Sequence, residues 1–245
     1  MTAVSVDHLS HSQIQEFTGC PRKWVYSHVH RVERERTGVA LVFGSAIHAG
    51  VAEINEAAFS GEQRPTLSFS TLVSSELAAA SAPVDDPEAL VELQITGQTL
   101  LDSYHAPPGI IGVEQAFDVV IDDALPPVTG RIDLIRRLDT GGLAIADVKT
   151  SASKVISDTS AVEAQLGLYD IAYPAEAHEA IVMAKLKKPV ISTQSIRAWS
   201  QPRLVNQYAA VYKAMVAGID YPVTGWHCAG CQYRDRCRRD CGARS

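Results

Sequence analysis

Strand-like runs cluster in the second half of the chain, and their order constrains the fold more than any other sequence feature. The turn signals DDALPPVTG and DTGG separate the first three runs, which indicates a three-strand meander. A helical pattern then precedes two further runs. The predicted strands span residues 110–121, 130–138, 143–150, 179–186 and 191–199. This order predicts an α/β core in which the central sheet has mixed pairing.

Helical patterns account for much of the remaining sequence. The predicted helices span residues 10–30, 44–59, 87–104, 160–173 and 201–217. The first has apolar residues at near-helical spacing and a capping serine, either Ser10 or Ser12. Residues 62–85 show no clear period, so we expect them to be irregular or weakly helical.

Length and composition fit one globular domain, residues 1–245. Of the 245 residues, 46% are hydrophobic, which is enough to bury a sizeable core. No apolar run reaches the roughly 18 residues that a membrane span needs. The N-terminus lacks the basic-then-apolar pattern of a signal peptide. We therefore expect a cytoplasmic protein that makes no membrane contact.

The formal net charge of −6 is unevenly distributed. Residues 52–123 contain thirteen acidic residues and a single basic one, Arg64. The segments 20–36 and 231–245 each contain five basic and two acidic residues. Basic clusters of this kind are either solvated surface charges or a surface that attracts a polyanion such as nucleic acid.

The segment LAIADVKTS, residues 143–151, places Asp147 and Lys149 on one face of a predicted buried strand. Pairing with the preceding strand places Asp133 opposite Asp147. A salt bridge at a sheet edge is one interpretation. The other is a metal site, because converging carboxylates are unfavourable without a cation and oxygen ligands suit Mg²⁺ or Mn²⁺. Lys149 would then orient the attacking water and offset charge on a phosphate.

Two further residues are candidates for the same site. His48 lies on the helix predicted at 44–59 and is either a structural residue or a further ligand. Glu114 lies at the start of the first predicted strand, and we expect a surface or strand-end carboxylate there rather than a site residue.

The five cysteines lie near the two ends of the chain. Four of them form the tail pattern C-x2-C-x5-C-x3-C, and in a cytosolic protein this clustering favours metal or cluster binding over disulfides. The four tail cysteines would bind zinc by themselves and leave Cys20 spare. Alternatively, Cys20 joins three of them around an iron–sulfur cluster and leaves Cys241 spare.

Four motifs occur in a characteristic order: GSAIHAGVAE, GRID, IADVKTS and QLGLY. Together they resemble the RecB-like form of the PD-(D/E)XK nuclease superfamily, with its pattern of G-x-x-x-H, G-x-x-D, D/E-x-K and Q-x-x-x-Y. Ile132 replaces the proline of the superfamily name, as is usual in that branch. The resemblance implies a restriction-endonuclease-like core over residues 44–200, with a mixed β-sheet flanked by helices.

The resemblance also implies roles for individual residues. His48, Asp133 and Asp147 resemble metal ligands, together with the Val148 carbonyl. Lys149 resembles the catalytic lysine, which acts with the two aspartates.

Two residues of the following helix complete this set. Gln165 and Tyr169 resemble the pair that holds DNA and organises the site. Their spacing of four residues places both on one helical face, as that role requires.

The context FTGCPRKW around Cys20 resembles the iron–sulfur branch of these nucleases. That branch includes AddB-type helicase–nuclease subunits and the CRISPR-associated protein four family of exonucleases with its phage-encoded relatives. The resemblance implies a structural [4Fe-4S] cluster held by Cys20, Cys228, Cys231 and Cys237. Residues 10–36 and 220–245 would then form one iron–sulfur module.

Function follows from the same resemblance. It implies a Mg²⁺- or Mn²⁺-dependent DNA exonuclease that prefers single strands or frayed ends, with 5′→3′ polarity favoured. A homo-oligomer or a protein partner of recombination or CRISPR type is also implied. Two other classes are weighed: a DNA-binding adaptor with a nuclease fold, and an iron–sulfur redox sensor, for which no electron partner is evident.

The module would supply the DNA-binding surface. The bases expected to contact DNA are Arg22, Lys23 and Arg234, brought together by the cluster. The nearby aromatic residues are either core residues or stacking platforms for unpaired bases. These are Trp24, Tyr26, Trp226 and Tyr233.

Overall fold

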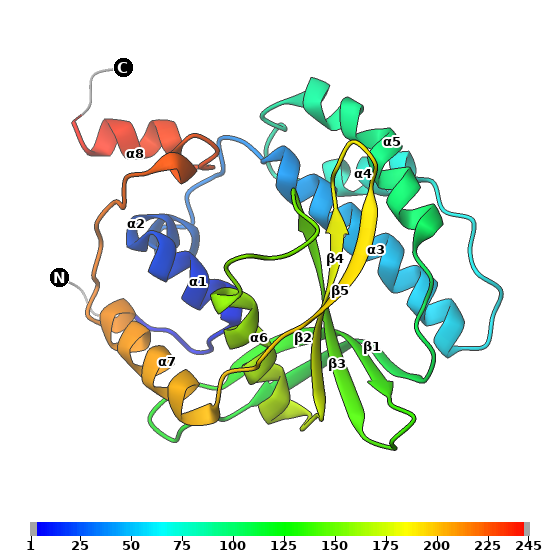
Figure 1. Ribbon diagram of the computed structural model, residues 1–245. Helices are drawn as coiled ribbons and strands as arrows, with labels where there is room; N and C mark the ends of the chain where they lie inside the picture. Colours follow the sequence, from blue (N-terminus) through cyan, green and yellow to red (C-terminus); the bar gives the residue numbers. More distant parts are fainter. Residues whose placement is uncertain (1–3, 243–245) are drawn as a thin grey trace.

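The computed structural model describes residues 4–242 of the chain. At its centre, five strands form one sheet in the order β1-β2-β3-β4-β5 (Figure 1). The strands are β1 (Ile110–Val119), β2 (Val128–Arg137), β3 (Leu143–Ser151), β4 (Ala177–Ala184) and β5 (Val190–Ser195). Each lies within a few residues of a predicted run.

The sheet has mixed pairing. Strands β1, β2 and β3 pair antiparallel, β3 and β4 pair parallel, and β4 and β5 pair antiparallel. Helix α6 (Ser160–Ala172) makes the crossover that the parallel pair requires. The predicted α/β class with a mixed central sheet is therefore confirmed.

Three helices cover one face of the sheet (Figure 1). They are α3 (Val39–Phe59), α4 (Phe69–Ala79) and α5 (Pro87–Ser103). Alternate residues of the central strands, such as Val148 of β3 and Ile181 of β4, point into this layer. The alternation follows from the two-residue period of a strand.

Helix α6 covers the opposite face, with α1 (His11–Gly19) and α7 (Gln201–Val216) outside it. Ile145 and Val182, which point away from the α3 layer, pack against Leu166 of α6.

Among the helices of residues 4–242, none is both long enough and apolar enough to cross a membrane.

The prediction of one continuous helix at 10–30 is wrong. The structure has α1, then α2 (Pro21–Trp24) and the π-helix η1 (Val25–Val29). Between α1 and α2, Cys20 is extended, with φ −164° and ψ 103°. Pro21 explains the break, because proline lacks an N–H group and disfavours helical geometry in the preceding residue. Ser10 caps α1, as predicted, by accepting the Gln13 N–H at 3.2 Å.

The segment 62–85 is more regular than predicted, because it contains helix α4. Phe69 and Val73 of this helix are buried, with exposed fractions of 0% and 3%. Serine and threonine make up much of its polar face, and these residues favour turns and caps, which hid the helical signal. Helix α3 also begins earlier than predicted, at Val39 rather than Gly44.

The C-terminal segment folds back onto the N-terminal helices. It contains the 3-10 helix η2 (Trp226–Cys228) and helix α8 (Arg234–Asp240). Tyr26 donates its hydroxyl to Asp240 at 2.7 Å, and the hydroxyls of Ser27 and Tyr233 lie 3.1 Å apart. The predicted association of the two ends therefore has a physical basis in direct side-chain contacts.

Glu35 fixes the start of α8 from a distant part of the sequence. Its carboxylate accepts the N–H groups of Asp235 at 2.9 Å and Arg236 at 2.8 Å. A negative charge at a helix N-terminus is favourable, because unpaired N–H groups gather there.

The boundaries of the predicted single domain, residues 1 and 245, lie outside the described residues.

Gly97 lies in the middle of α5 because a larger residue would not fit. A Cβ atom there would overlap the ring of buried Phe69. We predict that Gly97→Ala destabilises the protein by about 1–3 kcal/mol through overpacking, although alanine normally favours a helix. Thermal unfolding should show a Tm lowered by roughly 2–10 °C.

The matched control is Gly19→Ala at the end of α1, where no heavy atom lies within 4 Å of the added Cβ. Its Tm should not fall. An unchanged or raised Tm for Gly97→Ala would contradict the packing argument.

Candidate active site

Strands β2 and β3 pair over only part of their length, and the first site residues lie where they separate. The recorded pairing ends at Leu134 and Ala146. Just beyond it, Asp133 accepts the Val148 N–H at 2.7 Å through its carboxylate. The N–H and C=O of one strand residue point to the same side, so the Val148 carbonyl also faces the gap beside Asp133.

Asp147 is fully buried beside Lys149. The Lys149 Nζ atom lies 2.6 Å from Asp147 Oδ2. Apart from this contact with Lys149, the carboxylate of Asp147 has no hydrogen-bond partner among residues 4–242. A fully buried carboxylate with a single partner is costly. The arrangement therefore suits a cation in addition to Lys149.

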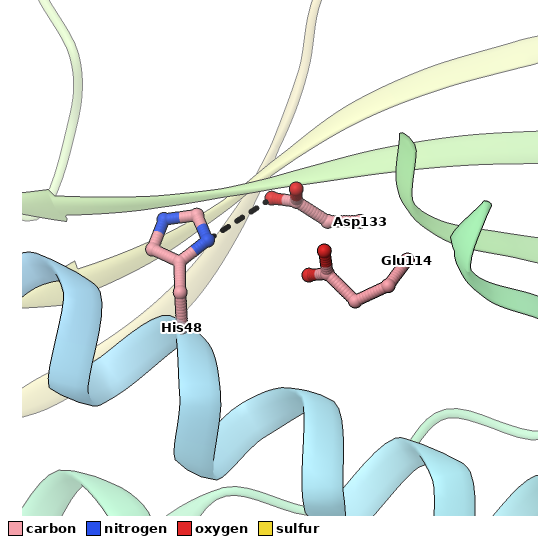
Figure 2. A group of neighbouring side chains, drawn as sticks. All are labelled: His48, Glu114 and Asp133. Carbon is pink, nitrogen blue, oxygen red and sulfur yellow. Dashed lines mark ion pairs between the residues drawn. The ribbon is translucent and has the colours of Figure 1, made fainter. Parts of the chain in front are cut away.

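Two more side chains converge on Asp133 (Figure 2). His48 of α3, Glu114 of β1 and Asp133 of β2 point toward one another, and one ligand atom of each lies within 4.8 Å of the others. His48 Nδ1 lies 3.5 Å from Asp133 Oδ2. An imidazole with two carboxylates is a donor set that divalent metals accept. The oxygens of Asp147 are not part of this group.

Glu114 is the residue that the sequence analysis undervalued. The expected surface or strand-end carboxylate instead lies within β1, and the strand register places it opposite Asp133. Its φ of 48° is uncommon for a residue other than glycine. Backbone strain of this kind concentrates at functional sites. An acid in a predicted strand next to Asp133 was the available signal, but the strand register was needed to use it.

Burial raises the pKa of both aspartates. At Asp147, burial outweighs the opposing charge of Lys149, the negative charge of Asp133 adds to it, and the pKa rises to about 6. At Asp133, burial again has the largest effect, against the opposing influence of His48 and the Val148 N–H. The site therefore carries more negative charge than its own residues neutralise well.

Gln165 and Tyr169 connect this charge cluster to helix α6. Lys149 donates to the side-chain oxygen of Gln165 at 2.9 Å. Gln165 in turn donates to the Tyr169 hydroxyl. Burial raises the pKa of Tyr169 above its usual value, with Asp147 and Asp133 adding to the effect, so the hydroxyl stays protonated. The pair positions the Lys149 ammonium group, and its predicted contact with DNA stays a prediction.

Cys20 and Cys228 both contact the backbone of Val223. The Val223 N–H donates to Cys20 Sγ at 3.4 Å, and Cys228 Sγ donates to the Val223 carbonyl at 3.6 Å. All five cysteines are free thiols. Two predicted cluster ligands more than 200 residues apart in sequence are therefore neighbours in the fold.

The other predicted cluster ligands lie in the same region. Burial raises the pKa of the Cys231 thiol, and Cys20 and Cys228 add to the effect. Burial and Cys241 raise the pKa of Cys237 to about 11, with a smaller contribution from Cys20. Within the described chain, no three cysteine sulfurs lie within 4.8 Å of one another. Cluster binding stays a prediction.

The three predicted DNA-binding bases lie at the junction of the two ends. Arg22 lies 2.6 Å from Asp220, and Lys23 lies 3.4 Å from Glu16, so both form ion pairs inside the protein. Arg234 forms no ion pair within residues 4–242. The charge of the predicted DNA-binding surface is thus partly neutralised, because the sequence does not reveal which acids lie beside its bases.

Only one of the four candidate stacking residues is accessible. Trp24, Tyr26 and Tyr233 are buried, so for these three the core interpretation is correct and stacking on bases is wrong. Trp226 differs sharply, because 91% of it is exposed.

The sequence pattern of the PD-(D/E)XK nuclease superfamily matches residues 8–238. The chain belongs to this superfamily. As a PD-(D/E)XK protein, it places Asp133, Asp147 and Lys149 of the sequence motifs around one gap in the sheet. Residues His48 and Glu114 extend this arrangement with donors from α3 and β1.

Two solved structures are similar to this superfamily member. The “Putative exonuclease” from Eubacterium rectale is 14% identical, with a TM-score of 0.56, and the match covers 96% of this chain and 88% of that one. SSO0001 is 16% identical, with a TM-score of 0.42 and 93% coverage of both chains. At these identities the first likeness supports the fold alone. A search of curated proteins gave no match.

We predict that the metal-free protein loses stability as the pH rises from about 4 to 6. Because folding raises the pKa of Asp147 above 3.8, the folded state holds this proton more tightly. Its contribution is complete below about pH 4 and is lost above about pH 6. It amounts to roughly 3 kcal/mol, since one pKa unit corresponds to about 1.4 kcal/mol.

Urea unfolding in EDTA, measured between about pH 4 and 8, tests this prediction. Asp147→Asn should remove most of this pH dependence, whereas Asp118→Asn, at an exposed position of β1, should retain it. Adding Mn²⁺ at about pH 7.5 should raise the Tm of the wild type and raise it less in Asp147→Asn. An Asp147→Asn protein with the full wild-type pH dependence would refute the assignment.

Proposed function

We propose that the protein is a Mg²⁺- or Mn²⁺-dependent DNA exonuclease of the RecB-like branch. The observation that carries the proposal is the fully buried Asp147 carboxylate, which lies 2.6 Å from Lys149 and has no other hydrogen-bond partner in the described chain. Membership of a nuclease superfamily supports the chemistry. The similar protein from Eubacterium rectale is called an exonuclease, which favours exonuclease activity.

The donor set fits a hard divalent cation. His48, Glu114 and Asp133 offer an imidazole and two carboxylates, and Asp147 and the Val148 carbonyl offer oxygens at the adjoining strand. When bound, such a cation lowers the pKa of a coordinated water and offsets the charge that develops on a phosphodiester.

The chain's own residues have distinct tasks in this proposal. Asp133 and Asp147 would hold the cation, which would offset the cost of burying their charges, the largest cause of their raised pKa values. Lys149 offers its ammonium group to the phosphate or the attacking water. Gln165 and Tyr169 orient that ammonium through their hydrogen-bonded chain and bind the DNA strand.

Trp226 supports a preference for single strands or frayed ends. A tryptophan that is 91% exposed offers a large flat surface to an unpaired base. Stacking of one base on an aromatic residue contributes about 1–3 kcal/mol and needs no particular sequence.

The finer proposal concerns the type of exonuclease and its polarity. We propose an exonuclease of the CRISPR-associated protein four type that digests DNA in the 5′→3′ direction. It would act alone, as a homo-oligomer, or with a protein partner of recombination or CRISPR type.

Degradation of end-labelled DNA tests the activity. Wild-type protein with Mn²⁺ should degrade single-stranded DNA and frayed duplexes faster than blunt duplexes, releasing a 5′ label first. Asp133→Ala and Lys149→Ala should reduce cleavage at least 100-fold, since each removes a group that acts on the metal or the phosphate. Lys149→Ala should retain DNA binding.

The matched control is Lys213→Ala, an exposed lysine of α7, which should cleave at the wild-type rate. DNA binding without cleavage by the wild type would instead support the adaptor function. Equal cleavage by wild type and Lys149→Ala would exclude the proposed site.

We further propose that Cys20, Cys228, Cys231 and Cys237 hold a structural [4Fe-4S] cluster. Cys20 and Cys228 both contact Val223, so two of the four proposed ligands lie close together although 208 residues separate them in sequence. A cluster held by all four cysteines would join the N- and C-terminal segments.

Iron content and visible absorbance of anaerobically purified protein test the cluster. Wild type should contain about four iron atoms per chain. Cys20→Ala should lose the iron and the absorbance and should unfold at lower temperature, because the cluster would join distant segments. Cys241→Ala, a change at the exposed fifth cysteine, should retain all three properties. Zinc in place of iron, or loss of iron in Cys241→Ala but not in Cys20→Ala, would overturn this assignment.

A further inference from the structure

Four lysines lie at the carboxyl ends of the two central strands. They are Lys154 in the loop after β3 and Lys185, Lys187 and Lys188 in the turn between β4 and β5. The parallel pairing of β3 and β4 brings these two connections to the same edge of the sheet. About thirty residues separate Lys154 from the other three in sequence, so the fold is needed to bring all four together.

Hydrogen bonds from the β4–β5 turn and from β5 hold the loop after β3 in place. The Lys185 N–H donates to the Ser151 carbonyl at 2.7 Å, and Ser192 donates its hydroxyl to the Lys154 carbonyl at 2.6 Å. Gln194 also bonds both the N–H and the carbonyl of Ile156. The lysines therefore project from a fixed platform rather than from two independent loops.

The charges of these lysines are not used inside the protein. Among residues 4–242, none of the four forms an ion pair, and Lys154, Lys187 and Lys188 are exposed. The acid of the same loop, Asp158, accepts the Ser160 N–H at the start of α6. By contrast, five basic residues of the two end segments, 20–36 and 231–242, form ion pairs with acids. The paired residues are Arg22, Lys23, Arg36, Arg236 and Arg239.

The platform adjoins the candidate metal site. Lys149 and Ser151 belong to the same strand two residues apart, so the loops begin about 7 Å beyond the Lys149 backbone. Lys185 reaches back over the ring of Phe43, with Nζ 5.1 Å from the ring centre, on the helix that carries His48. A DNA strand advances about 3.4 Å per nucleotide, so the lysines lie on the order of two to four nucleotides from a phosphate at the metal site.

We propose that Lys154, Lys187 and Lys188 bind phosphates of the DNA strand that is cleaved, a few nucleotides away from the phosphate at the metal site. This inference rests on the proposed nuclease function and adds the surface that holds the substrate. Three exposed charges on a rigid platform attract a phosphodiester backbone irrespective of its sequence. Their distance from the metal site makes them positioning residues rather than catalytic ones.

The test measures binding of fluorescent single-stranded DNA by anisotropy at several salt concentrations, in a Lys149→Ala background that does not cleave. The variant Lys154→Gln/Lys187→Gln/Lys188→Gln should raise Kd about 10- to 100-fold near 0.1 M salt. It should also reduce the slope of log K against log salt by about 2, since each single-strand phosphate contact contributes about 0.7.

The matched control is Arg137→Gln/Arg197→Gln/Lys213→Gln, which removes the same three positive charges. Arg137 ends β2 and Arg197 follows β5, both at the opposite edge of the sheet, and Lys213 lies on α7. Its slope should equal that of the unmodified background. In the cleaving protein, the lysine variant should raise KM and leave kcat within about twofold. Equal slopes and affinities for the two triple variants would overturn the inference.

The two proposals fail in different ways. If the wild type binds DNA and does not cleave it, the nuclease assignment fails, and the anisotropy comparison still decides the role of the lysines. If the wild type cleaves DNA and the lysine variant matches its control, only the lysine inference fails. Absence of DNA binding by the wild type would overturn both.

Discussion

One hydrogen bond keeps the central sheet open at the site: the Val148 N–H donates to the Asp133 carboxylate where β2 separates from β3. In a continuous ladder a main-chain carbonyl would accept this N–H and the strands would close. A side chain in that place satisfies the backbone and leaves a gap. Asp133 is thereby turned toward His48 and Glu114 while β3 remains fixed by its pairing with β4.

The electrostatics of the molecule follow from this gap. Carboxylates gather at it from several strands, burial makes their charge costly, and Lys149 offsets part of it. The unpaired lysines lie at the edge of the sheet where β3 and β4 end. Three arginines of the two end segments pair with acids on the facing segment: Arg22, Arg36 and Arg239. The lysines beside the acidic centre thus keep charges that can attract a polyanion, although the chain as a whole is acidic.

Local patterns predicted the elements whose signals are local. The strand alternation between residues 110 and 150 and the order of the motifs led directly to Asp133, Asp147 and Lys149. The break at Cys20 follows from Pro21, but the near-helical apolar spacing on both sides of it predicted one continuous helix. Glu114 was undervalued because its role depends on strand register and on a φ of 48°, neither of which is written in neighbouring residues. Ion pairing at the chain ends depends on tertiary contacts and was equally out of reach.

The contact between Cys20 and the segment around Cys228 has a consequence for synthesis. Cys20 leaves the ribosome 208 residues before Cys228, a delay of roughly 10–40 s at ordinary rates of translation. Helix α8 has seven residues, too few to be stable alone, and Glu35 is made about 200 residues before it. During this interval the Cys20 thiol and the Glu35 carboxylate lack the C-terminal groups that they contact in the folded protein. Completion of the fold at this junction therefore waits until the segment that holds Cys228 and α8 has been made.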